Sequence, residues 1–230
     1  MICPLLVLLA ASGPQFDITD ARGKKPSGVT IEAGAPDVDG WMELKPGGKA
    51  KVPYLLVWPF DGRAKNPDGP GPMSVIVMER ADPKALLNPK VTSALLAAQL
   101  LGKPFDAGVD AAALKQAAAT LGKSEDYWAK GVGLLYNGKA SDAAEPLGKA
   151  LRERERVLTR IPSEIYPAAM LSGRALLEAG KFDEAALAFL KAVKLRPSER
   201  APREARAQAL VKAGKPEAAQ AALDPALEKH

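Results

Sequence analysis

The sequence predicts an α+β multidomain protein, in which a small N-terminal β-sandwich is followed by an all-α array of helical hairpins. Two observations support this division. The C-terminal half nearly repeats itself, because residues 176–185 and 210–219 are close copies that lie 34 residues apart. A period of this size indicates stacked helix pairs. Residues 14–85, in contrast, are rich in Pro and Gly and alternate apolar with polar residues, which is typical of strands joined by turns.

The chain begins with an apolar run, residues 1–13, that ends in small residues. This run is too short to span a bilayer, and it predicts a secretory signal peptide cleaved after Ser12. We therefore expect an extracytoplasmic protein, periplasmic or secreted. The run lacks the positive residues that usually open a signal, so a longer signal and a buried strand are alternatives. In the last case the protein is cytoplasmic.

Residues 14–85 are predicted to form the β-sandwich module. An irregular loop with three prolines and three glycines spans residues 61–72. The expected strands cover residues 16–20, 28–33, 54–58 and 73–78.

One part of this module carries a recognisable pattern. Asp20 and Gly23 frame a turn, Pro26 follows, and Gly28-Val29 precedes an alternating strand. The run resembles the opening of carboxypeptidase-regulatory-like modules, which are small prealbumin-type β-sandwiches. The resemblance implies a non-catalytic module in an exported bacterial protein. A different small β-sandwich is the alternative.

Residues 86–123 are predicted to be a helical connector or cap. Ala- and Leu-rich helical patterns cover residues 91–101 and 111–121, and Gly102-Lys103-Pro104 separates them. They do not fit the repeat frame. We expect them either to dock the β module or to cover the exposed first helix of the array.

Three repeat units are predicted in residues 124–230, at 124–157, 166–199 and 200–230. Gly138, Gly180 and Gly214 take the helix-ending position of the three units, and Gly180 and Gly214 stand where a left-handed residue is favoured. Small residues at Gly173 and Ala207 let the two helices of a unit approach closely. This pattern resembles the tetratricopeptide repeat (TPR) family over the C-terminal half. An ordinary antiparallel helical bundle is the alternative.

The resemblance implies a concave groove, lined by the first helix of each unit, that binds a protein or peptide partner. The alternative is that Leu135, Leu177 and Val211 pack between helices while the other positions are solvated surface. The positions that the family pattern points into the groove are Trp128, Val132, Leu135, Tyr136, Met170, Arg174, Leu177, Glu178, Glu204, Gln208, Val211 and Lys212.

The residues that catalysis or metal binding require are scarce. The only histidine is His230 and the only cysteine is Cys3, which argues against His-based triads and His-rich metal sites. Asp61 and Asp68 could form a carboxylate pair or a weak Ca²⁺ site, but Asp-Gly pairs are common in turns. We therefore expect no enzyme activity, no cofactor and no metal.

The net charge of +5 is spread along the chain, with 14 basic and 12 acidic residues before position 124 and 18 and 15 after it. This pattern argues against nucleic-acid binding. No later run is apolar enough to cross a membrane, and self-association through the C-terminal end of the array is a further expectation.

The sequence thus predicts a non-catalytic exported scaffold or adaptor. The alternative is an envelope structural or carbohydrate-binding protein acting through the β module, with Trp41 and Trp58 as the sugar platform. A carboxylate hydrolase is the third hypothesis.

Overall fold

The computed structural model describes residues 16–20, 27, 30–36, 42–47, 54–56, 73–77, 86–102, 109–157 and 162–224. For the strands the description covers the backbone. The predicted signal segment, Trp41, Trp58, Asp61, Asp68, Cys3 and His230 lie outside these residues.

Five short strands lie in the N-terminal third. They are β1 (Phe16–Asp20), β2 (Thr30–Pro36), β3 (Met42–Gly47), β4 (Tyr54–Leu56) and β5 (Met73–Val77). One sheet has the order β1-β5-β4, in which β1 and β5 are parallel and β4 and β5 antiparallel, while β2 and β3 form an antiparallel pair. The β3 strand has no counterpart among the expected strands. The β-sandwich stays a prediction, because it depends on side chains outside the described residues.

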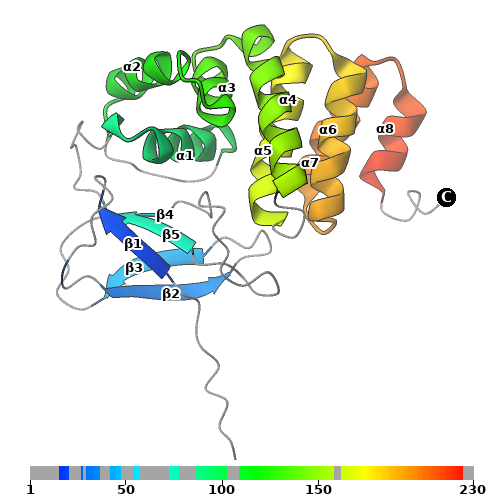
Figure 1. Ribbon diagram of the computed structural model, residues 1–230. Helices are drawn as coiled ribbons and strands as arrows, with labels where there is room; N and C mark the ends of the chain where they lie inside the picture. Colours follow the sequence, from blue (N-terminus) through cyan, green and yellow to red (C-terminus); the bar gives the residue numbers. More distant parts are fainter. Residues whose placement is uncertain are drawn as a thin grey trace, which may run out of the picture.

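The rest of the described chain is helical. The helices are α1 (Pro89–Leu100), α2 (Ala111–Leu121), α3 (Tyr127–Tyr136), α4 (Ala140–Val157), α5 (Pro162–Glu178), α6 (Phe182–Leu195), α7 (Arg200–Lys212) and α8 (Pro216–Leu223). From α3 onward each helix contacts the next, and the hairpins α3–α4, α5–α6 and α7–α8 stack side by side (Figure 1).

The three hairpins share one turn. Gly138, Gly180 and Gly214 all have a φ between 74° and 78°, a left-handed conformation that side chains disfavour. In each turn the lysine after the glycine donates its backbone N–H to a carbonyl five residues earlier, at 2.9 Å. This is the bond of a Schellman cap. The expectation of left-handed glycines at Gly180 and Gly214 is confirmed.

Side-chain caps begin the earlier helices. The side chains of Asn88, Asp110 and Asp126 accept hydrogen bonds from backbone N–H groups in the first turns of α1, α2 and α3. Each such cap satisfies a donor that the helix itself leaves free. Helix α5 begins at Pro162, earlier than the expected unit start at Tyr166, because proline fits the first position of a helix.

A buried polar cluster joins the second and third hairpins. Glu199, which is 4% exposed, precedes α7 and accepts hydrogen bonds from the Tyr166 hydroxyl and, at 2.7 Å, from Nη1 of Arg196. The Arg196 guanidinium also lies 4.2 Å from the centre of the Tyr166 ring. The cluster ties the first turns of α5 to the turn between α6 and α7, and so fixes the angle between neighbouring units.

Candidate functional site

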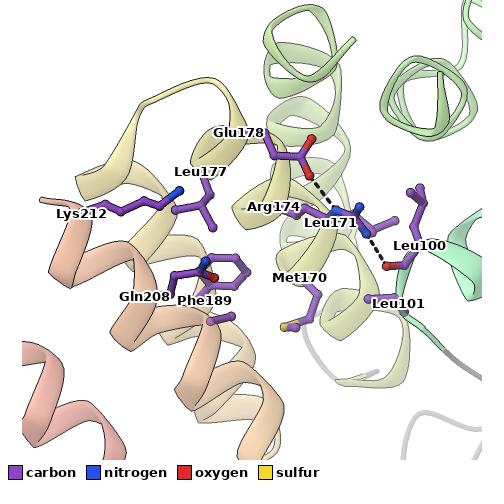
Figure 2. Close-up of a pocket in the computed structure, with 11 residues that line it drawn as sticks. Leu100, Leu101, Met170, Leu171, Arg174, Leu177, Glu178, Phe189, Gln208 and Lys212 are labelled. Carbon is purple, nitrogen blue, oxygen red and sulfur yellow. Dashed lines mark hydrogen bonds and ion pairs between the residues drawn. The ribbon is translucent and has the colours of Figure 1, made fainter. Parts of the chain in front are cut away.

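A pocket of about 370 Å³ opens between α5 and α7, and the end of α1 closes one side of it (Figure 2). Its walls are mainly apolar, with polar groups at both ends. The lining residues are Leu100, Leu101, Met170, Leu171, Arg174, Leu177, Glu178, Phe189, Ala205, Gln208 and Lys212.

Helix geometry explains why these residues converge. Met170, Arg174 and Leu177 are spaced by four and three residues, so they lie on one face of α5. Gln208 and Lys212 are four residues apart on α7 and approach from the other side. Phe189 of α6 lies between the two helices and is 2% exposed. The pocket therefore has a fixed aromatic floor.

Half of the expected groove positions line this pocket: Met170, Arg174, Leu177, Glu178, Gln208 and Lys212. The structure brings together all four positions from the second unit and two from the third. Their contact with a partner stays a prediction.

The four positions from the first unit lie elsewhere. Trp128, Val132 and Leu135 are buried in the helical core together with Leu96 of α1, and Tyr136 is partly buried against the same core. Helix α1 packs on α3, and this contact removes the first unit from the accessible groove. For Leu135, burial between helices corresponds to the alternative interpretation of the sequence.

Two positions of the third unit lie outside the pocket. Glu204 forms an exposed ion pair with Arg200, with 2.6 Å between Oε1 and Nε. Val211 is 59% exposed on α7. Both are on the surface near the pocket without lining it.

Arg174 is the polar centre of one end of the pocket. Its Nε donates to Oε1 of Glu178 at 2.8 Å, and its Nη1 donates to the backbone oxygen of Leu100 at 2.6 Å (Figure 2). Leu100 ends α1, where carbonyls have no partner within the helix and carry partial negative charge. Arg174 thus fastens the end of α1 to α5.

The other end of the pocket carries a more accessible charge. Lys212 is exposed in the last turn of α7, and its ammonium lies 5.9 Å from the centre of the Phe182 ring. Within the described part of the chain, Lys212 has no ion pair. A partner's acidic group could therefore approach Lys212 without displacing another carboxylate.

Sequence reasoning missed the contribution of α1. Leu100 and Leu101 close one side of the pocket, yet they lie outside the repeat frame. The only signal available was the Ala- and Leu-rich pattern of residues 91–101, which indicates a buried helix without showing where it packs.

The described residues hold no group of three or more His, Cys, Asp or Glu side chains that could bind a metal ion. Among the same residues no helix is long and apolar enough to cross a membrane.

Comparison with known proteins supports the interpretation of the helices. A model of the tetratricopeptide repeat family matches residues 129–200, which run from α3 to the first residue of α7. These residues resemble tetratricopeptide repeats. The TPR match indicates a role in protein–protein interaction or scaffolding. No curated protein matches the chain, and no solved structure does. The carboxypeptidase-regulatory-like resemblance stays a prediction.

Proposed function

We propose that this protein is a non-catalytic adaptor that binds a segment of a partner protein in the pocket between α5 and α7. The observation that supports the proposal most is the pocket itself, in which α5 and α7 of consecutive TPR-like hairpins converge on an apolar floor. Large apolar side chains in such a pocket supply most of the binding energy of a peptide interface, and polar groups at the rim orient the segment.

The proposed binding mode follows from the lining residues. An apolar side chain of the partner fills the space beside Met170, Leu177 and Phe189. Gln208 offers both hydrogen-bond donors and acceptors to the partner's main chain, and Lys212 offers a positive charge. Arg174 contributes less to the partner, because its Nε and Nη1 already donate to Glu178 and Leu100.

We further propose that this interaction takes place outside the cytoplasm of a bacterium. The support for this part is the apolar N-terminal run followed by small residues. Fusion of residues 1–20 to a reporter that is active only after export tests it, and a reporter that stays inside the cell contradicts it.

The binding proposal is tested by site-specific photo-crosslinking. A photoreactive amino acid at Gln208, inside the pocket, should crosslink a partner that the same amino acid at Lys130, on the exposed side of α3, does not capture. The crosslinked protein is then purified and its affinity for the full chain is measured by calorimetry.

Two variants that introduce the same charge test whether the partner binds in the pocket. Leu177→Asp places a charge in the pocket wall and should weaken binding by at least about tenfold, as expected for a central apolar contact. Val211→Asp introduces the same charge on α7 outside the pocket and should leave the affinity unchanged. Equal effects of both variants, with unchanged circular dichroism, would reject the pocket as the binding site.

A further inference from the structure

A second groove, of about 630 Å³, lies between α4 and α6. Ser172 and Leu176 of α5 form its floor. Successive helical residues are rotated by about 100°, so these two face away from Met170 and Leu177, which line the first pocket. Leu151 and Ala188 add apolar walls. The groove is therefore a separate surface on the other side of α5.

Leu187 stands at the edge of this groove and is 63% exposed, the most exposed large apolar side chain on the described part of helices α2–α8. It also borders a smaller hollow of about 210 Å³ that contains Leu190 and Leu210. The exposed face of α6 thus forms a ridge between two partly apolar hollows, and Leu187 is its most exposed apolar residue. A ridge beside a groove is the arrangement by which helices interdigitate.

The charges along the ridge are opposite on the two sides of Leu187. Glu184 lies three residues before it and Lys191 four residues after it, so all three side chains share one face of α6. Both charged residues are exposed, and their present ion pairs, Lys181–Glu184 at 3.8 Å and Lys191–Glu155 at 2.7 Å, are surface pairs of small energy. They remain accessible to a second partner.

We propose that the occupant of this groove is a second copy of the chain, packed with its α6 antiparallel to the first. A two-fold axis near Leu187 places each Leu187 in the groove of the other copy, because the ridge and the groove belong to the same surface. The same axis brings Glu184 of each copy opposite Lys191 of the other. Two new ion pairs then flank the apolar centre.

The charges on α6 complement those of an antiparallel second copy of the same helix, which favours a second copy of the chain as the occupant. An antiparallel copy of α6 matches negative to positive on both sides of Leu187, whereas a parallel copy sets like charges against each other. The proposal does not depend on the function of the first pocket, which faces away from this interface.

Sedimentation velocity of the full chain tests the proposal, over an approximately hundredfold range of concentration because dimer formation follows mass action. The natural chain should shift from monomer to dimer. Leu187→Asp should raise the dimer dissociation constant by at least about tenfold, because it places a charge at an apolar centre. Val211→Asp, a similarly exposed apolar position on α7, is the matched control and should leave it unchanged.

Charge reversal identifies the antiparallel arrangement. Glu184→Lys and Lys191→Glu should each weaken self-association, because each places two like-charged pairs across the interface. An equimolar mixture of the two variants should form a heterodimer again, since position 184 of each variant then faces an opposite charge at position 191 of the other. Circular dichroism checks that each variant folds.

Three outcomes would overturn the proposal. A chain that stays monomeric at every concentration means that the groove serves another partner or none. A dimer that Leu187→Asp leaves intact places the interface elsewhere. A mixture of the charge variants that remains monomeric excludes the antiparallel pairing.

Discussion

At the scale of single residues, two glycines determine how closely the helices of a hairpin pack. A Cβ atom at Gly131 would lie 2.6 Å from Cγ of Leu147, and one at Gly173 would lie 2.6 Å from Cε1 of Phe189. Both distances are too short for carbon atoms in contact. The two glycines occupy equivalent places in the first and second hairpins, so the close approach belongs to the repeat.

Replacing Gly173 by alanine should therefore destabilise the protein, although alanine favours helix more than glycine does. Three atoms of the Phe189 ring lie within 2.9 Å of the new Cβ, and overpacking of this kind lowers the free energy of unfolding by about 1–3 kcal/mol. Urea denaturation followed by circular dichroism measures the change.

Gly148 provides the matched control within α4. A Cβ there would meet its nearest atom at 3.5 Å, an ordinary contact, so Gly148→Ala should raise the free energy of unfolding by about 0.5–1 kcal/mol. Equal stabilisation by both substitutions would show that the Gly173 contact relaxes without strain.

The sequence predicted the backbone conformation of single residues better than the burial of their side chains. The repeat frame identified Gly180 and Gly214 as left-handed positions, because the turn depends on residues within the same hairpin. It placed Trp128 at an accessible groove, where the structure shows a buried ring with the Arg154 guanidinium 4.0 Å from its centre. That burial arises in a core that spans α1 to α6, most of which lies distant along the chain from Trp128.

At the scale of elements, α1 differs from the helices of the array. Eight consecutive residues, 91–98, are buried, so α1 is enclosed on all sides. It contacts α2, α3 and α5, and its last carbonyl accepts a hydrogen bond from Arg174. Stacked repeats need their terminal helices covered, and α1 covers the first helix of the first unit.

Removal of the Arg174 side chain should loosen the end of α1. A hydrogen bond from a charged donor contributes about 1.5–3 kcal/mol when protected from water, and partial exposure of Arg174 reduces this to roughly 1 kcal/mol. Arg174→Ala should therefore speed hydrogen exchange of the Leu101 and Gly102 amides about fivefold. Native-state exchange followed by mass spectrometry measures this rate.

The control is Arg200→Ala, which removes an exposed cation that pairs with Glu204 along α7. Exchange at the end of α1 should not change in this variant. Slower or unaltered exchange in Arg174→Ala would mean that packing of Leu100 and Leu101 alone holds the helix.

The sequence left open whether α1 docks the β module or covers the first helix of the array, because the contacts of α1 are distant along the chain. Helix α4, in contrast, runs through the charged residues 152–156 to Val157, and side chains spaced i to i+4 along it interact locally. The pocket also combines positions that the sequence predicted with positions that depend on contacts distant along the chain. The positions on α5 and α7 followed from the resemblance to tetratricopeptide repeats, whereas the end of α1 joins the pocket through a contact between residues 74 apart.

At the scale of the whole molecule, two overlapping cores connect the helices. One joins residues of α1 to α6 around Leu147 and Leu171, and the other joins α5 to α8 around Phe189 and Leu210. Met170 and Leu176 of α5 pack against both clusters. Coupling between distant hairpins therefore passes through α5.

A cavity in one core should destabilise a different set of helices from a cavity in the other core. Leu147→Ala and Leu210→Ala each remove a buried leucine and should lower the free energy of unfolding by about 2–5 kcal/mol. In repeat arrays the effect spreads mainly to neighbours. Exchange protection should fall across α5 to α8 for Leu210→Ala, and across α1 to α6 for Leu147→Ala. Uniform loss of protection in both variants would show one indivisible cooperative unit.

The contact between Arg174 and Leu100 also has a consequence for the order of folding. Each glycine turn closes with a hydrogen bond between residues five apart, so a hairpin can form as soon as its own residues are available. The carbonyl of Leu100, in contrast, accepts its hydrogen bond from Arg174, which lies 74 residues later in the chain. Contacts of such separation form late, because a long loop must be closed first. During synthesis α1 can therefore pack on α2 and α3 as soon as these helices exist, whereas its last carbonyl gains the Arg174 donor only after α5 has been made.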